Sequence, residues 1–271
     1  MGIRSRAMAI GIITGSGTYA LPGFDGGGPE PVATPWGDAL LSRGTFAGTD
    51  VLHVSRHEAG HARLSSAVAH RANIAALTQE GATAVLAVTV CGAVDPTLEL
   101  GSIVCFDDLH FVANRLGNGE LCTFHPEPGD PRRGHWIFDD PFSAELRTAL
   151  LEGAAEAGVE VRDGGCYGHV DGPRFNTKAE IRGLAACGVT AVSQTAGPET
   201  TLCGEAELPY ALLGYATDYA NGVQYEPTPV QTLLDMMAAS TETFAAVLAA
   251  AVPRAATGEP KPAGFVHRFE G

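Results

Sequence analysis

The chain has 271 residues, of which 45% are hydrophobic and 18% are charged, and it contains 34 Gly and 17 Pro. This composition is typical of a compact globular protein with many tight turns, and it excludes a disordered chain. The formal net charge of −14 argues against nonspecific binding to nucleic acid or to an anionic membrane surface. No run of about 18 consecutive apolar residues predicts a transmembrane helix. The cytoplasm is therefore the expected location.

The six cysteines are far apart in the sequence, and no Cys-x-x-Cys pair occurs among them. Neither a zinc site nor a dense disulfide framework is expected, and reduced, packed thiols are the simpler interpretation. The cysteines are Cys91, Cys105, Cys122, Cys166, Cys187 and Cys203.

The first predicted strand is the apolar run over residues 9–13, and residues 1–8 are expected to form a peripheral tail. The strand ends at a turn, Gly15-Ser16-Gly17, in which glycine lets backbone N–H groups and one hydroxyl approach an anion. By itself this turn is a weak signal, because Gly-x-Gly turns are common. A third Gly, which a dinucleotide-binding oxidoreductase would need, is missing.

Two further predicted strands also end in small or polar residues. The strand over residues 49–54 leads into Ser55-Arg56-His57, and the strand over residues 83–90 leads into Cys91-Gly92-Ala93. A helix is expected between them, over residues 65–80. Ligands of α/β proteins gather at the carboxyl ends of strands, so these turns are the expected location of a site.

The rest of the chain continues the alternation of strands and helices, which predicts a single α/β domain over residues 1–271. Asn176 or Thr177 is the expected N-cap of the helix over residues 177–187. The segment 114–134 is expected to be a loop and residues 254–271 a peripheral tail. The remaining predicted strands cover 101–106, 165–170, 190–193 and 210–217, and the remaining predicted helices cover 141–158 and 228–252.

Seven motifs occur in one order along the chain, and together they are far more specific than any one of them. They are Gly15-Ser16-Gly17, Ser55-Arg56-His57, Arg71-Ala72-Asn73-Ile74, Thr89-Val90-Cys91-Gly92, Gly172-Pro173-Arg174-Phe175 followed by Glu180, the run from Gln194 to Glu199, and Ala216-Thr217-Asp218-Tyr219. In this set the chain resembles the trimeric purine nucleoside phosphorylase family, and within it the 5′-methylthioadenosine phosphorylases. The resemblance covers residues 10–248.

The resemblance implies a mixed, twisted central sheet flanked by helices, a homotrimer or a dimer of trimers, and inorganic phosphate as co-substrate without metal or organic cofactor. It places phosphate between Ser16, Arg56, His57, Thr89 and Thr195. It places the purine and ribose at Phe175, Gln194, Asp218 and Ala220. It implies a 5′ pocket formed by His135, Val230 and Leu234, with His135 reaching a neighbouring subunit. Asp218 and His57 are the candidate catalytic residues.

The chemistry accounts for these residue types. Cleavage of an N-glycosidic bond builds positive charge on the ribose while the purine leaves as an anion, so the reaction needs a fixed anionic nucleophile and a proton donor. Phosphate held by hydroxyls and Arg56 supplies the first, and the carboxyl of Asp218 supplies the second. A carboxylate also accepts hydrogen bonds from a 6-amino group, which favours an adenine-type base.

The sequence departs from the family at four positions. Gln194 replaces a methionine under the ribose, and Ala220 replaces a second aspartate, which weakens the preference for adenine. Glu58 replaces a glycine beside the anion site, and His70 replaces a tyrosine.

Phosphorolysis of 5′-methylthioadenosine, or of another 5′-deoxyadenosine derivative, is the leading hypothesis. A phosphorylase of 6-oxopurine nucleosides such as inosine, guanosine or methylthioinosine is the alternative enzyme. A nucleoside-binding relative with weakened catalysis is an alternative of a different class, motivated by Gln194 and Glu58. Turnover of a nucleoside panel with phosphate separates these hypotheses.

Overall fold

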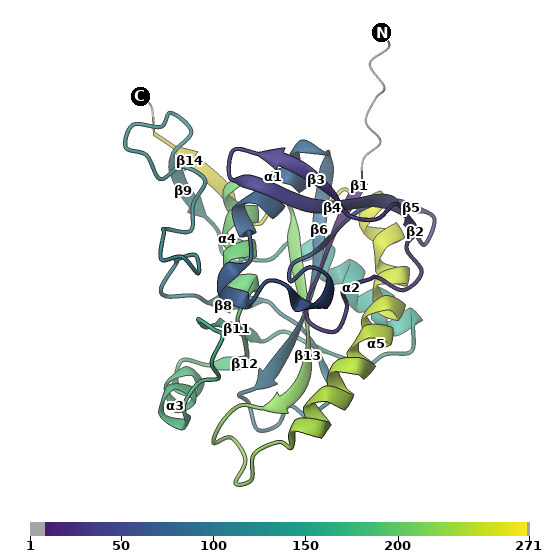
Figure 1. Ribbon diagram of the computed structural model, residues 1–271, viewed down its shortest axis with the longest axis vertical. Coiled ribbons are helices and arrows are strands. Elements are labelled where there is room, and N and C mark those ends of the chain that lie inside the picture. The colour runs from purple at the N-terminus through teal and green to yellow at the C-terminus, as the bar shows by residue number, and fades with distance from the viewer. Residues whose placement is uncertain (1–8, 270–271) are drawn as a thin grey trace.

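A computed structural model describes residues 9–269, in which one large mixed β-sheet carries helices on both faces (Figure 1). The main path of the sheet runs β10-β7-β13-β6-β1-β5-β4-β2. The α-helices are α1 (His70–Gln79), α2 (Ala144–Glu156), α3 (Lys178–Ala186), α4 (Ala196–Glu205) and α5 (Val230–Thr257). The strands of the main path are β1 (Ala9–Thr14), β2 (Asp25–Gly26), β4 (Gly37–Phe46), β5 (Thr49–Ser55), β6 (Ala82–Ala93), β7 (Ile103–Cys105), β10 (Val161–Asp163) and β13 (Tyr210–Tyr219). The others are β3 (Glu30–Thr34), β8 (Asp108–His110), β9 (Gly134–Ile137), β11 (Cys166–His169), β12 (Val189–Ser193) and β14 (Phe265–Arg268).

Four neighbouring strands, β13, β6, β1 and β5, are parallel to one another. All six residues of β1 are buried, as expected of a strand covered on both faces, and its apolar run reflects this. Because parallel strands end at one edge of the sheet, the turns that follow β1 and β5 and the last residues of β6 and β13 come together there. That edge positions the site.

Alternate residues of β1 enter two different core layers, as the two-residue period of a strand requires. Ile13 packs in the layer that contains α1 and α4, with Leu77 and Leu202. Ile12 packs in the layer that contains α2 and α5, with Leu150 and Leu248. The single α/β body with a mixed sheet and flanking helices confirms the predicted fold class.

Several element boundaries differ from the prediction. Residues 65–67 form a short 3₁₀ turn, so α1 begins only at His70. The prediction also lacked α4 and the long antiparallel strand β4. Of the two predicted N-caps, Thr177 is the one that caps α3, through a reciprocal capping box with Glu180.

The segment expected as a tail after residue 253 is structured. Pro253 lies inside α5, which continues to Thr257 instead of ending at Val252, and β14 pairs antiparallel with β9. The tail proposed for residues 1–8 lies outside the described residues.

Helix α5 is long and apolar enough, by length and composition alone, to cross a membrane. Its buried side chains, among them Phe244 and Leu248, pack in the core layer shared with α2. This packing accounts for part of the helix's apolar character.

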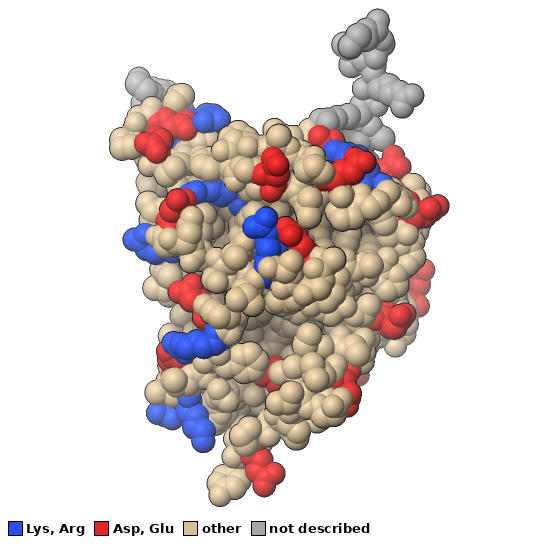
Figure 2. All heavy atoms as spheres, viewed as in Figure 1, with Lys and Arg blue, Asp and Glu red and all other residues tan. Residues whose placement is uncertain are grey.

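The charged side chains visible on one face of the molecule are interspersed rather than gathered by sign. Figure 2 shows Asp and Glu spread over that face, with Lys and Arg in small groups and no continuous basic patch. A polyanion would find no extended complementary surface on this face.

Candidate functional site

A cavity of about 270 Å³ opens where β1, β5, β6 and β13 end. One part of its wall is polar and buried, and another is formed by exposed loops. The lining residues used below are Ser16, His57, His61, Leu64, Ser65, Thr89, Phe175, Ser193, Gln194, Thr195, Asp218, Ala220, Leu233 and Met237.

The Gly15-Ser16-Gly17 turn forms the wall of the cavity after β1. The backbone N–H of Thr18 donates to the carbonyl of Gly15 at 3.1 Å, and Gly17 has a φ of 84°, which favours glycine. Ser16 lines the cavity. A Cβ added to Gly15 would lie 2.5 Å from Nη1 of Arg56, so this glycine leaves space for the arginine behind the turn.

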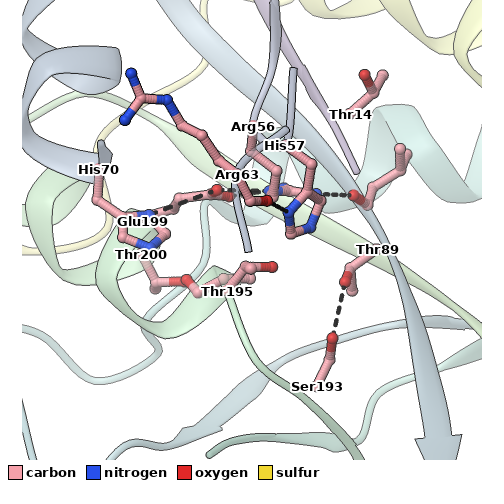
Figure 3. A network of polar contacts seen from close by, with 12 residues as sticks. Thr14, Arg56, His57, Arg63, His70, Thr89, Ser193, Thr195, Glu199 and Thr200 are labelled. Carbon is pink, nitrogen blue, oxygen red and sulfur yellow. Dashed lines mark hydrogen bonds and ion pairs between the residues drawn. The ribbon is translucent and has the colours of Figure 1, made fainter. Parts of the chain in front are cut away.

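Arg56 lies beneath the cavity and is not one of its lining residues. Its Nε and Nη2 donate to the two carboxylate oxygens of Glu199, at 2.7 and 2.8 Å, and its Nη1 donates to the carbonyl of Val88 at 2.7 Å (Figure 3). Both side chains are fully buried. Burial alone would raise the pKa of Glu199, but the Arg56 guanidinium outweighs it and holds that pKa below its usual value. Arg56 is thus held as a bidentate buried ion pair.

His57 presents a neutral imidazole to the cavity. Its Nδ1 is 2.9 Å from the carbonyl oxygen of Arg63, and its ring stacks on His61 with centroids 4.2 Å apart. Burial, followed by the positive charge of Arg56, lowers the pKa of His57 to about 4. With Nδ1–H donated to the carbonyl, Nε2 carries a lone pair at neutral pH.

Buried hydroxyls continue the polar wall. Thr89 and Ser193 hydrogen-bond each other at 3.2 Å, and both line the cavity. Thr195 stands at the N-cap position of α4 without a side-chain cap bond, and its backbone N–H donates to the hydroxyl of Tyr167 at 3.4 Å. The Thr195 hydroxyl is therefore not used as a helix cap.

The other end of the cavity combines a buried carboxyl with an exposed aromatic ring. Asp218 accepts a hydrogen bond from the hydroxyl of Thr217 at 2.9 Å, and burial raises the pKa of its carboxyl. Phe175 is 62% exposed. Ala220 lies beside Asp218 in the lining. An acid that retains its proton more readily and a flat apolar surface suit a planar nitrogen base.

Two of the unusual residues have partners in the structure. Glu58 forms an ion pair with Arg63, so its carboxylate is neutralised beside the anion end of the cavity. Gln194 accepts from the hydroxyl of Ser65 at 2.8 Å and donates to the carbonyl of Arg174 at 3.1 Å.

The three residues predicted for the 5′ pocket lie outside the lining of this single chain. Val230 and Leu234 are exposed on α5, whereas Leu233 and Met237 of the same helix line the cavity. His135 is exposed on β9, with its ring edge-on to Phe269. Their role in a 5′ pocket stays a prediction.

Several residues that contribute to the site, among them His61, Ser65 and Glu199, have no role in the sequence-based prediction. His61 and Ser65 follow His57 on a loop, and only the recurrence of polar residues after a strand end could have indicated them. Glu199 falls within a recognised motif, but its partner Arg56 is 143 residues away in the sequence.

Within residues 9–269, no group of three or more His, Cys, Asp or Glu side chains is arranged to hold a metal ion. The six cysteines are all unpaired, and five are buried. Burial raises the pKa of the Cys91 thiol, which keeps it protonated beside the cavity.

Hydroxyls, a buried carboxyl and an exposed aromatic ring thus line one cavity. The chain belongs to the phosphorylase superfamily, whose sequence profile matches residues 9–253.

Named relatives fall into two substrate groups. The chain is 34% identical to an S-methyl-5′-thioadenosine phosphorylase of Bradyrhizobium diazoefficiens, over 78% of this chain and 70% of the relative. It is 30% identical to a 6-oxopurine nucleoside phosphorylase of Pyrococcus furiosus, over 90% and 92%. A structure of methylthioadenosine phosphorylase from Schistosoma mansoni in complex with adenine superimposes with a TM-score of 0.82 at 27% identity, over 91% of each chain. These likenesses confirm the family resemblance seen in the sequence.

Proposed function

We propose that the protein cleaves a purine nucleoside by phosphorolysis, with 5′-methylthioadenosine or another 5′-deoxyadenosine derivative as substrate. The products are the free base and a 5-substituted ribose 1-phosphate. The observation that carries the proposal is a single cavity with hydroxyls at one end and the buried carboxyl of Asp218 at the other.

Phosphate is the nucleophile in this reaction. Its oxygen forms a bond to the anomeric carbon while the bond from that carbon to N9 of the purine breaks, and the bonding pair leaves with the base. Ser16, Thr89 and Thr195 offer hydroxyl donors to the phosphate. Arg56 contributes its positive charge from behind the Gly15 turn. Neutral His57 accepts a hydrogen bond from a phosphate hydroxyl through Nε2.

Asp218 supplies the proton that the leaving purine needs at N7. Its burial raises the carboxyl pKa, which shifts the group toward the protonated form that can donate. Transfer of that proton to the base leaves a carboxylate, which the Thr217 hydroxyl stabilises.

Apolar residues of the cavity support a methylthio group as the 5′ substituent. Leu64, Leu233 and Met237 line the cavity. An apolar wall accepts a methylthio group and leaves a 5′-hydroxyl without a partner.

Ala220 is the observation that favours 6-oxopurine nucleosides instead. It adds no second acceptor near Asp218, so recognition of a 6-amino group rests on one carboxyl. Relatives named for 6-oxopurine nucleosides and, as probable, for methylthioinosine belong to the same family as those named for methylthioadenosine.

Purified protein incubated with methylthioadenosine should release adenine only when phosphate is present, as product chromatography would show. Parallel reactions with inosine and methylthioinosine, compared by kcat/KM, rank the two base classes. No adenine release with phosphate, together with turnover of inosine, would reverse the assignment.

We further propose a cytoplasmic homotrimer, or a dimer of trimers. The exposed residues His135, Val230 and Leu234 support contact with a neighbouring subunit. Light scattering during size-exclusion chromatography tests the trimer, and a monomer mass would contradict it.

A further inference from the structure

The side chain of Gln194 lies where two parts of the cavity rim meet. One part is the loop that carries His61, Leu64 and Ser65, and the other is the segment 172–177, which carries Phe175. Gln194 itself follows β12 and directly precedes Thr195. It thus stands between the hydroxyls proposed for phosphate and the ring proposed for the base.

Both polar atoms of the Gln194 carboxamide are used to join these two parts. Oε1 accepts from Ser65 at 2.8 Å, and Nε2 donates to the carbonyl of Arg174 at 3.1 Å. Ser65 is 129 residues from Gln194 and Arg174 is 20 residues away, so the amide links distant segments. Neither an apolar side chain nor a carboxylate can make both bonds, because the carbonyl of Arg174 needs a donor.

Gly172 leaves the space in which this bridge fits. A Cβ at this position would overlap both Oε1 of Gln194 and Oγ of Ser65. The φ angle of Gly172 is not positive, so the obstacle to an alanine there is this packing conflict and not a left-handed φ.

The segment 172–177 is held at its far end by separate contacts. Arg174 pairs with Glu180, Thr177 caps α3, and the amide of Asn221 donates to the carbonyl of Asn176 at 2.7 Å. On the side that faces Ser65, the segment is held by the hydrogen bond from Gln194 to the carbonyl of Arg174. Removal of the amide therefore loosens one edge of the segment without unfolding α3.

We propose that Gln194 is a positioning residue for the nucleoside: its carboxamide ties the Ser65 loop to the backbone of Arg174 and so holds Phe175 over the base. This inference rests on the proposed function. It predicts that loss of the amide weakens nucleoside binding selectively, because the carboxamide bonds to Ser65 and Arg174 and to none of the hydroxyls proposed for phosphate.

Two variants break the bridge by different routes. Gln194→Met keeps the length of the side chain and removes both hydrogen bonds, and Gly172→Ala displaces the amide by steric overlap. Each should raise KM for methylthioadenosine about tenfold, the effect of losing one or two hydrogen bonds of ordinary strength. The kcat and KM for phosphate should change less than about twofold.

Ser65→Ala should produce part of the rise in KM for methylthioadenosine. Ser65→Thr keeps the hydroxyl and should leave that KM near the wild-type value. Gln79→Met is the matched control, because Gln79 lies on the last turn of α1 outside the cavity lining and its replacement should leave both KM values unchanged.

Hydrogen exchange of the unliganded protein tests the bridge without any assumption about the substrate. Residues 172–177 should exchange faster in Gln194→Met and Gly172→Ala than in the wild type, and equally fast in Gln79→Met. Unchanged exchange in both bridge variants would overturn the proposal. If the bridge variants exchange faster but the wild-type protein does not turn over any nucleoside, the proposed function is rejected and the bridge is retained. Equal rises in KM for phosphate and nucleoside would overturn the selective role.

Discussion

The two ends of the cavity are built in different ways. The phosphate end consists of strand ends and buried side chains, with Arg56 and Glu199 almost inaccessible and Thr89 and Thr195 buried. The base end combines the buried carboxyl of Asp218 on β13 with loop segments, and its aromatic residue Phe175 is 62% exposed. The phosphate end is part of the protein's core, whereas the segment that carries Phe175 is attached to it by a few hydrogen bonds.

This difference indicates how the two binding tasks are divided. An anion needs donors that are already in place, because reorganising dipoles around a charge weakens electrostatic stabilisation. A flat base and a variable 5′ substituent are recognised by surfaces that need fewer fixed contacts. We therefore expect loss of the buried ion pair at the phosphate end to affect folding, and changes to the loop segments at the base end to affect selectivity.

Arg56→Met should have the largest effect on stability. It leaves the carboxylate of Glu199 buried without its guanidinium partner, and breaking a buried pair in this way costs about 3–5 kcal/mol. Urea unfolding measures the loss. Arg254→Met, which removes an exposed pair with Glu156, is the control and should lose less than about 1 kcal/mol. Equal losses in the two variants would contradict a special role for the buried pair.

Asp218→Asn should lower kcat/KM for methylthioadenosine about 100-fold, because an amide cannot transfer the proton. The loss should be smaller with methylthioinosine, since an amide can donate to a 6-oxo group. An equal loss on both substrates would restrict Asp218 to an interaction with N7.

The same variant should be more stable than the wild type at pH 8. Burial raises the pKa of folded Asp218 above 3.8, so the wild type loses stability as the pH rises from 3.8 through that raised value and then levels off. Asparagine does not titrate and lacks this loss. Unfolding free energies of both proteins at pH 4 and pH 8 measure the difference, and a greater advantage at pH 4 would contradict the sign.

Thr89→Val should raise KM for phosphate about 20-fold while the fold is kept, because it replaces a hydroxyl proposed to donate to an anion by an isosteric methyl group. Thr200→Val is a matched control. The Thr200 hydroxyl is buried but donates to the carbonyl of Ala196 within α4, outside the cavity. Steady-state kinetics with varied phosphate should separate the two; a similar rise in both would argue for a general structural effect.

The smallest effect is expected at the 5′ end. Met237→Ala should lower the kcat/KM ratio of methylthioadenosine to adenosine about fivefold, the scale of an altered apolar contact. Leu234→Ala should change that ratio less than about twofold, because Leu234 is exposed in the single chain. The reverse ranking would mean that Leu234 completes the pocket in the assembled oligomer.

Much of the fold was predictable from the sequence because its central strands are short apolar runs that end in recognisable turns. The strands β1, β5 and β6 were each predicted next to the motifs that follow them. Strand β4 was missed because Gly, Asp, Ser and Arg interrupt its apolar residues, and only four of its ten residues are buried. Its place in the sheet depends on pairing with β5, which a local pattern does not contain.

The site shows the same division between local and distant information. Ser16, His57, Thr89 and Thr195 lie beside strand ends and line one cavity. The pairing of Arg56 with Glu199 joins distant parts of the chain and was not predictable from the sequence. On α5, neighbouring residues differ by about 100° around the axis. Leu233 therefore lines the cavity while the adjacent Leu234 is exposed in the single chain, and the place of Leu234 in a 5′ pocket stays a prediction.

The close contact between Gly15 and Arg56 also bears on which sequences can evolve at this site. Gly17 is required by a left-handed backbone angle, but Gly15 is required by the volume of an arginine from the turn after β5. The two glycines of the turn are thus constrained by different parts of the molecule. A second-site suppressor of Gly15→Ala would have to arise at Arg56 or its partners, whereas one for Gly17→Ala would have to reshape the turn itself.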